Sequence, residues 1–427
     1  MANDKQSLVM KRAFKYRLYP TKEQEEILDK YLEESRQLYN SLLEASIKAY
    51  KEENKNLLGY DLQKAALKLR KEKGFTVYSQ STQDVADRVT KSFKNFFRRV
   101  KENKEGKKQK VGYPRFKPFG RYKSITFPQY HEGFKILGDN LLSVSGVGIL
   151  KIKYLKDITG KIKTLTIKKE PTGNWYAVII AEGEFKNENH VCEGDKAVGI
   201  DIGITSLVAT SDGELVQNPK ILNKSEKLLK IRNRQLSKKQ KRSKNRVKAK
   251  IRLAKVYKRI EKERETFLHE ITNRLIKDYK FIILEKLNIM GIVRNHHLAK
   301  SILDASWNEL IRQLSYKAEE AGSVVLLVDP RNTSKTCSRC GWIDENLTLE
   351  DRVFKCENCG LEMDRDVNAA KNIYKLGLEQ LEKLGTLSRR GTMLNACGDE
   401  ASTLEQSKAS IVAEAGKLGS DLRFQDY

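Results

Sequence analysis

Two acidic residues stand in apolar segments, where an unpaired carboxylate is costly. Asp201 lies inside the segment Val198–Ile202, and Glu285 ends the segment Phe281–Leu284. A buried carboxylate needs a partner, and a metal ion is one such partner. The structural alternatives are a strand end satisfied by backbone amides for Asp201, and a frayed strand end beside Lys286 for Glu285.

A third carboxylate, Asp366, stands where a helix is expected to begin, and Asp364 precedes it by two residues. Aspartate is an ordinary N-cap residue, so a helix start alone explains an acidic residue here. Together, Asp201, Glu285 and Asp366 can converge on one or two Mg²⁺ ions, which prefer carboxylate oxygen and keep water ligands. Two such ions, about 4 Å apart, activate water and stabilise the leaving oxygen of a phosphodiester. The three acids therefore predict hydrolytic strand cleavage, with Asp364 open as a competing third ligand.

Four of the six cysteines form two C-x-x-C pairs separated by fifteen residues: Cys337, Cys340, Cys356 and Cys359. Four thiolates close a tetrahedral shell around zinc and leave no position for water, so the metal holds the fold. Disulfides or redox activity are the alternatives. Because we find no apolar secretion signal, the spacing favours zinc and a cytoplasmic protein, active at the prokaryotic nucleoid.

The charge of the chain indicates a polyanionic partner. Its 82 Lys and Arg residues exceed its 56 Asp and Glu residues, which gives a formal net charge of +26. Proteins this basic usually face nucleic acid. A membrane surface is the rival partner, but we find no run of eighteen apolar residues and no lipidation motif, so no membrane partner is expected.

The elements that must position these residues follow from hydrophobic periodicity. A strand is predicted before Pro20, then helices with a capping box at Thr21. A basic, turn-rich stretch begins at residue 106, where strands replace helices, and short strands continue to about residue 184. This order predicts a β-domain interrupted by a helical insertion. Beyond residue 196, strands alternate with helices, as in an α/β layer. Residues 224–264 hold 19 Lys or Arg and three Glu; a phosphate-tracking helical arm is favoured over a merely solvated helix pair.

Several motifs together resemble the TnpB family, the transposon-encoded RNA-guided DNA nucleases related to compact type V CRISPR effectors. The motifs are Tyr16-Arg-Leu-Tyr-Pro-Thr21, Gly112-Tyr-Pro-Arg-Phe-Lys117, Gly199-Ile-Asp-Ile-Gly203, Leu284-Glu-Lys-Leu287, Thr336-Cys-Ser-Arg-Cys-Gly341 and Asp364-Arg-Asp-Val-Asn-Ala-Ala-Lys-Asn372. The resemblance extends to about residue 385.

The resemblance implies a multidomain α/β protein. A RuvC nuclease domain of ribonuclease H-like fold would span residues 196–330 and 361–385, with a zinc-ribbon target-nucleic-acid-binding module inserted at 331–360. A β-barrel wedge domain, similar to oligonucleotide-binding domains, would span residues 1–20 and 119–195, interrupted by a helical recognition domain at 21–118. Residues 386–427 are expected to form a flexible tail. The catalytic acids implied are Asp201, Glu285 and Asp366, holding Mg²⁺ or Mn²⁺, with Asp364 the less favoured third ligand.

The resemblance also implies a guide RNA derived from the transposon end, which pairs with double-stranded target DNA beside a short flanking motif. The protein would act as a monomer or a dimer on RNA. Candidate nucleic-acid contacts combine aromatic and basic side chains, with ordinary packing as the alternative. They are Tyr113, Arg115, Phe116, Arg98 and Arg99, with Lys241 and Arg242 in the basic stretch.

Three other functions are alternatives to a transposon-encoded nuclease. An RNA-guided repressor with a silent nuclease is disfavoured because all three acids are present. A compact type V CRISPR effector has the same chemistry and stays open. A DNA-transposing enzyme is disfavoured, since His296 and His297 are adjacent rather than separated by an apolar residue beside a candidate tyrosine.

Overall fold

The chain forms two compact units, residues Met1–Phe185 and Lys186–Tyr427. The computed structural model describes residues 10–106, 109–138, 140–153, 158–183, 195–287, 296–348 and 351–393. Cys192 and Cys397 lie outside these ranges, as do residues 394–427 of the expected tail. The finer domain boundaries inside each unit stay predictions.

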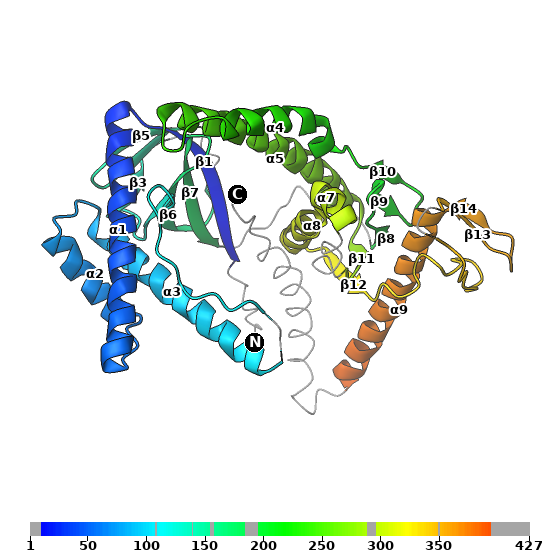
Figure 1. Cartoon of the computed structure of the whole chain (residues 1–427). Helices are drawn as coiled ribbons and strands as arrows, with labels where there is room; N and C mark the ends of the chain where they lie inside the picture. Colours follow the sequence, from blue (N-terminus) through cyan, green and yellow to red (C-terminus); the bar gives the residue numbers. More distant parts are fainter. Residues whose placement is uncertain are drawn as a thin grey trace. The chain divides into compact units, whose positions relative to one another are not determined.

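The first unit is built on a seven-stranded antiparallel sheet of order β2-β6-β7-β1-β5-β4-β3 (Figure 1). Its strands are β1 (Met10–Tyr19), β2 (Ser124–Phe127), β3 (Phe134–Ile136), β4 (Leu141–Val144), β5 (Gly148–Ile152), β6 (Lys161–Lys169) and β7 (Trp175–Gly183). In β1, Tyr16 and Leu18 are buried. Lys15 and Arg17 lie on the other face of the strand, where their cations contact the ring of Tyr176. The strand predicted before Pro20 is therefore present, with one buried face and one cationic face.

Three helices separate β1 from β2: α1 (Lys22–Glu53), α2 (Tyr60–Glu72) and α3 (Ser79–Lys104). The expected capping box begins α1, with Thr21 and Gln24 bonded reciprocally. Buried Glu34 of α1 accepts hydrogen bonds from the backbone N–H groups of Thr76 (2.9 Å) and Val77 (2.7 Å), which fixes the connection between α2 and α3. A helical insertion thus interrupts a nearly closed β-sheet, as the sequence predicts.

The second unit contains a five-stranded mixed sheet of order β10-β9-β8-β11-β12. An antiparallel meander is formed by β8 (Ala197–Asp201), β9 (Ser206–Thr210) and β10 (Leu215–Gln217), with the predicted Asp212-Gly213 turn between the last two. The strands β11 (Phe281–Glu285) and β12 (Val324–Val328) run parallel to β8. Four of the five β11 residues are buried because helices cover both sides.

Helices α5 (Lys244–Asp278) and α8 (Trp307–Ala321) pack on one face of this sheet, and α9 (Arg365–Met393) packs on the other. The basic stretch forms α4 (Ile221–Ser237) and the first half of α5, joined by a small apolar seam that includes Leu229 and Leu253. A shorter helix, α7 (His296–Ala305), precedes α8.

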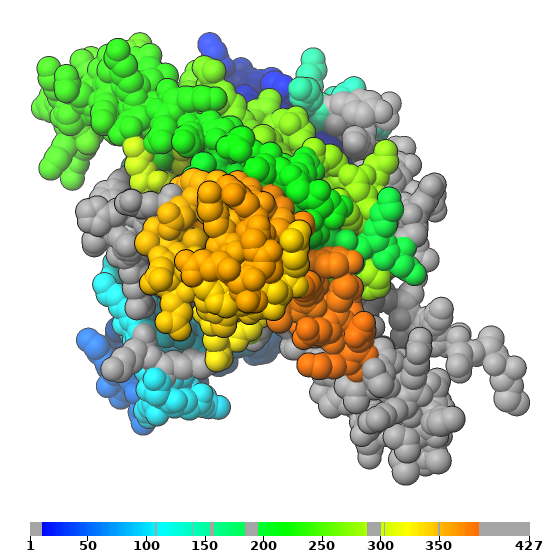
Figure 2. Space-filling view, turned by 90° about the vertical axis from the view of Figure 1, so that its right-hand side faces the viewer, coloured from blue at the N-terminus to red at the C-terminus, as the bar shows by residue number. Residues whose placement is uncertain are grey.

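The cysteine module lies between β12 and α9 and contains the hairpin strands β13 (Val353–Lys355) and β14 (Glu362–Asp364). Figure 2 shows the module, coloured yellow to orange, against the orange helix α9 of the same unit. Helix α9 continues to Met393, so residues 386–393 are helical and the predicted tail boundary is wrong there. The predicted fold class, a multidomain α/β chain with a four-cysteine module, is confirmed.

None of the helices within the described ranges combines the length and the apolar content that a membrane span requires.

Candidate active site

Asp201 and Glu285 are the last residues of two neighbouring parallel strands. Leu284 is in register with Ile200, so the two acids come next on the same edge of the sheet. Successive strand residues face opposite sides. Because Ile200 and Leu284 pack in the core under α5 and α8, whereas Ile283 packs with α9, both carboxylates point to the α9 side.

Asp366 reaches this place because α9 crosses β8 at very short range. A Cβ atom at Gly199 would collide with the backbone oxygen of Ala370 and would lie 2.5 Å from the backbone nitrogen of Tyr374. Only glycine permits this approach. The crossing sets the first turn of α9, which includes Asp366, beside the end of β8.

Asp364 is occupied as the cap of α9. Its carboxylate accepts hydrogen bonds from the backbone N–H groups of Asp366 (2.9 Å) and Val367 (3.2 Å), which is the N-cap arrangement. Asp366 instead interacts with Arg365, with the closest atoms 3.2 Å apart, and with the charge of Asp201. The capping role expected for Asp366 therefore belongs to Asp364, which leaves the Asp366 carboxylate uninvolved in the cap and near the charge of Asp201.

The electrostatics of the three acids suit a divalent cation. Burial, followed by repulsion from Glu285 and Asp366, raises the pKa of Asp201 to about 8. Burial also raises the pKa of Glu285, while a hydrogen bond from Thr333 opposes the shift. A divalent cation would offset both the cost of burying these carboxylates and their repulsion. Their oxygens are more loosely placed than the cysteine sulfurs, since only the cysteines in the described residues form a ligand group within 4.8 Å.

The raised pKa of Asp201 predicts that the Mg²⁺-free chain loses stability as the pH rises. Since the pKa of Asp201 is about 8 in the folded chain and near 3.8 otherwise, the folded state binds more protons between these values, and the free energy of unfolding falls across that window. Asp201→Asn should reduce the fall. Melting temperatures measured between pH ~5 and ~8, in buffer without added Mg²⁺ or Mn²⁺, test this. Asp195→Asn, an exposed acid before β8, should behave as wild type; identical pH slopes for Asp201→Asn and wild type would contradict the prediction.

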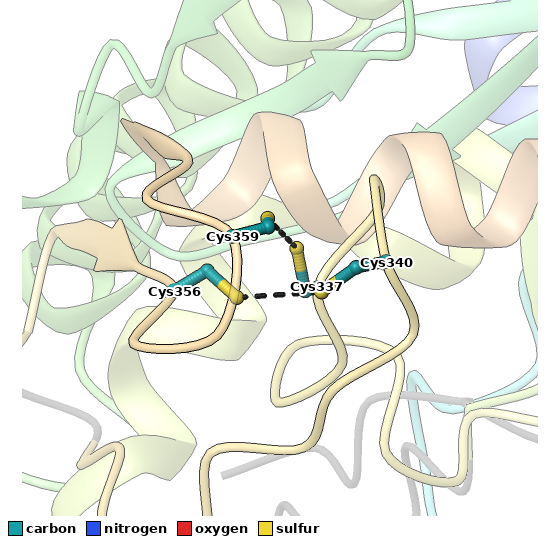
Figure 3. A group of neighbouring side chains, drawn as sticks. All are labelled: Cys337, Cys340, Cys356 and Cys359. Atoms are coloured by element: carbon teal, nitrogen blue, oxygen red, sulfur yellow. Dashed lines mark hydrogen bonds between the residues drawn. The ribbon is translucent and has the colours of Figure 1, made fainter.

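The four cysteines form two similar knuckles that face each other (Figure 3). The Sγ atoms of Cys337 and Cys359 lie 3.6 Å apart, and those of Cys340 and Cys356 lie 3.5 Å apart. A tetrahedral zinc site with bonds of ~2.3 Å places its sulfurs ~3.8 Å apart, whereas a disulfide needs ~2 Å. The sulfur positions therefore fit zinc and exclude disulfides among these four residues.

Each knuckle turns through a glycine with positive φ, Gly341 (79°) and Gly360 (67°). In each, the glycine N–H donates to the carbonyl of the first cysteine, at 3.0 Å for Cys337 and 2.9 Å for Cys356. Hydrogen bonds from the Trp342 backbone and the Asn358 side chain lower the pKa of Cys340 to about 6. These donors favour the thiolate that metal binding requires.

The candidate aromatic contacts are divided between packing and exposure. The Tyr113 ring packs edge-on against Phe93 and Phe96, with centroids 5.7 and 5.1 Å away, yet 46% of Tyr113 is exposed, as is 52% of Phe116. The segment is held to α1, because the Lys117 backbone N–H donates to Asn40 at 2.7 Å. Packing against Phe93 and Phe96 therefore accounts for part of the Tyr113 ring, whereas more than half of Phe116 is exposed.

The basic candidates are surface residues. Arg98 pairs with Glu102 at 2.9 Å, and Arg99 donates to the Asn95 carbonyl at 3.1 Å. Lys241 and Arg242 are exposed in the turn between α4 and α5, as Arg115 is exposed in its segment. These positions leave the cations accessible to phosphate, and their role stays a prediction.

Sequence reasoning missed the residues that support the acids. The hydroxyl of buried Thr333 donates to Glu285, and the Trp307 indole N–H donates to the Gly203 carbonyl at 3.1 Å, just after Asp201. Asn372 donates to backbone carbonyls of the loop that holds Thr333. Only Asn372 stood within a recognised motif; Thr333 and Trp307 carry no pattern that marks them.

Family models match three segments of the chain. Residues 10–55 match a family described as "Helix-turn-helix domain", residues 182–296 one described as "Probable transposase", and residues 307–373 one described as "Cas12f1-like, TNB domain". Within residues 10–55 the structure has the strand β1 and the single long helix α1, so no helix-turn-helix is formed there.

Relatives match most of the chain. A Streptomyces pristinaespiralis protein named "Putative RNA-guided DNA endonuclease" is 34% identical over 378 residues, covering 86% of this chain and 90% of the relative. One of the same description from Escherichia coli K12 is 29% identical, covering 70% and 74%. A Cas12f1 endodeoxyribonuclease from Sulfoacidibacillus thermotolerans is 46% identical over 68 residues, which are 16% of each chain.

Among solved structures, a Cas12f1–sgRNA–target DNA complex matches 86% of this chain and 99% of that chain, with a TM-score of 0.54 and 15% identity. This likeness concerns the fold alone. The extended identity to the Streptomyces protein, together with the three family models, decides the assignment: the chain belongs to the TnpB family.

Proposed function

We propose that this protein is an RNA-guided DNA endonuclease that hydrolyses phosphodiester bonds in an active site formed by Asp201, Glu285 and Asp366. One observation carries the proposal: two strand ends and a helix start bring three acids together, and burial, followed by repulsion from Glu285 and Asp366, raises the pKa of Asp201 to about 8. Perturbed pKa values of this kind cluster at functional sites. The family membership supports the same chemistry.

Asp201, Glu285 and Asp366 would hold Mg²⁺ or Mn²⁺. When bound, the cations supply positive charge that activates water and stabilises the leaving oxygen. Asp201 would give up the proton that its raised pKa favours, because a cation replaces the repulsion of the other acids with attraction. Thr333 holds the Glu285 carboxylate from one side, and Arg365 neutralises part of the charge of Asp366.

The nucleic-acid partners would be a guide RNA from the transposon end and a double-stranded DNA target beside a short flanking motif. The net charge of +26 favours the simultaneous binding of two polyanions, the guide RNA and the target DNA. The wedge, helical, RuvC and zinc domains would keep the boundaries inferred from the sequence, with zinc in a structural role. Candidate contacts are Arg98, Arg99, Tyr113, Arg115 and Phe116 of the first unit and Lys241 and Arg242 of the second.

Binding of the guide RNA should weaken steeply with salt, because each phosphate contact releases a counterion. The logarithm of affinity should fall against the logarithm of salt concentration with a slope of about −0.9 per contact, so the double variant Lys241→Ala, Arg242→Ala should reduce the slope by about two. Filter binding over a series of salt concentrations measures it. Lys48→Ala with Lys68→Ala, whose cations lie near Glu52 and Glu72, is the charge-matched control. An unchanged slope in the 241/242 variant would remove this turn from the interface.

The proposal is tested by co-expressing the chain with its neighbouring genomic sequence and sequencing the co-purified RNA. The complex is then incubated with Mg²⁺ and matched plasmids that carry randomised flanks. Flank-dependent cutting that is lost in Glu285→Ala supports the nuclease. Guided binding without cutting would indicate the repressor, RNA from a CRISPR array would indicate a type V effector, and absence of RNA would refute RNA guidance.

A further inference from the structure

Thr333 lies where the loop after β12 passes the end of β11. Its side-chain hydroxyl donates to an oxygen of Glu285, and both residues are buried, with exposed fractions of 5% and 8%. The carbonyl of Pro330 lies 3.1 Å from the same hydroxyl. Because a hydroxyl has one hydrogen, the bond to Glu285 and the bond to Pro330 are alternatives.

The loop that carries Thr333 is fastened to α9. The side-chain amide of Asn372 donates to the carbonyls of Thr333 (2.8 Å) and Thr336 (2.6 Å), which uses both of its hydrogens. One turn earlier, Asn368 donates to the Thr336 carbonyl (2.7 Å) and accepts from the Ser338 N–H (2.9 Å). Both asparagines are buried.

These bonds connect three parts of the second unit. Thr333 contacts Glu285 at the end of β11, and four residues later Cys337 begins the first zinc knuckle. The helix that supplies both asparagines begins with Asp366 in its first turn. A displacement of the loop would therefore shift the Glu285 carboxylate relative to the other two acids.

We propose that Thr333 is a positioning residue that orients Glu285 for metal binding, and that Asn372 keeps it in place by tying the loop before the zinc knuckle to α9. This inference rests on the proposed function. Residues that hold a metal ligand from behind are worth about 10- to 100-fold in metal affinity. The hydroxyl binds one carboxylate oxygen of Glu285, Oε1, and would leave Oε2 for the metal ion.

The test replaces Thr333 in the full RNA-bound complex. Thr333→Val keeps the side-chain shape and removes the hydroxyl, so the Mg²⁺ concentration that gives half-maximal cleavage should rise by about tenfold or more. Thr333→Ser retains the hydroxyl and should stay close to wild type. Thr82→Val is the matched control, because Thr82 is also a buried threonine and its hydroxyl donates to the Ser79 carbonyl at 2.5 Å.

A second readout does not need DNA cleavage. Fe²⁺ in place of Mg²⁺, with ascorbate and peroxide, generates hydroxyl radicals that cut the polypeptide next to the bound ion. Fragments ending near residues 201, 285 and 366 should require more Fe²⁺ in Thr333→Val than in wild type or Thr82→Val, and Asn372→Ala should resemble Thr333→Val.

The outcomes separate the two proposals. Equal Mg²⁺ and Fe²⁺ requirements in Thr333→Val and wild type would overturn the positioning role, as would a Thr333→Ser variant that is as impaired as Thr333→Val. A wild-type complex that never cuts DNA would refute the proposed function, while the polypeptide fragments would still decide the role of Thr333.

Discussion

Asp201→Ala is expected to abolish DNA cleavage while guide-dependent DNA binding persists. Loss of this carboxylate removes a metal ligand and with it several kcal/mol of transition-state stabilisation, which corresponds to a rate reduction of about 10³-fold or more. The fold should tolerate the change, because the variant removes a carboxylate whose pKa is raised by burial and by repulsion from Glu285 and Asp366. Single-turnover cleavage and gel-shift binding, measured on the same complex, separate the two effects.

Asp195→Ala is the matched control for this variant. Asp195 precedes β8, the strand that Asp201 ends, and it is exposed, so it lies at the opposite edge of the sheet. It should cut DNA at the wild-type rate. Cleavage by Asp201→Ala at the wild-type rate would remove Asp201 from the site, whereas equal loss of binding and cleavage would indicate a folding defect.

The two acids at the strand ends could be identified from the sequence, because a carboxylate in an apolar strand is costly unless it has a partner. Asp201 and Glu285 stand out from Val198–Ile202 and Phe281–Leu284 by residue type alone. Their common orientation was not predictable, since it depends on the register Ile200↔Leu284 between strands that are distant in the chain. Local pattern identifies such candidates, and tertiary pairing brings them together.

The choice between Asp364 and Asp366 needed the helix geometry. Both are acids at a helix start, and capping preferences describe either position. Only the hydrogen bonds from two backbone N–H groups assign the cap to Asp364 and leave Asp366 near Asp201. Thr333 was out of reach for the same reason, because a threonine in a loop acquires its role only from the buried glutamate that it contacts.

Element boundaries failed where helices outlast their apolar pattern. The prediction ended α9 at residue 385, before a segment rich in Ser, Gly and Thr, but the helix continues to Met393. Likewise, α5 is one helix of 35 residues whose N-terminal half is rich in Lys and Arg. The apolar C-terminal part of α5 packs on the sheet through Leu268 and Leu275, which stabilises the helix there. The Lys- and Arg-rich segment continues the same helix, because Lys and Arg have high helix propensity.

Cys337→Ser is expected to lower both zinc content and thermal stability. Cys337 is 1% exposed, and its removal leaves three thiolates that cannot close a tetrahedral shell. Structural zinc contributes folding free energy directly, so a loss of about 3 kcal/mol or more should reduce the melting temperature by ~6–12 °C in a unit of this size. Metal analysis by mass spectrometry should give about one zinc per wild-type chain and less in the variant.

The effect should extend to the nuclease site, because the knuckle and the acids share α9. The Ser338 N–H, next to Cys337, donates to Asn368, and the same helix holds the loop of Thr333 through Asn372. Cys337→Ser should therefore reduce cleavage as well as stability, whereas Asp201→Ala should reduce cleavage alone. Cys192→Ser, a thiol without a C-x-x-C partner, should leave zinc content, melting temperature and cleavage unchanged. A Cys337→Ser chain that lacks zinc yet melts and cuts as wild type does would show that the metal has no structural role, and the contrast between Cys337→Ser and Asp201→Ala distinguishes a metal that holds the fold from one that does the chemistry.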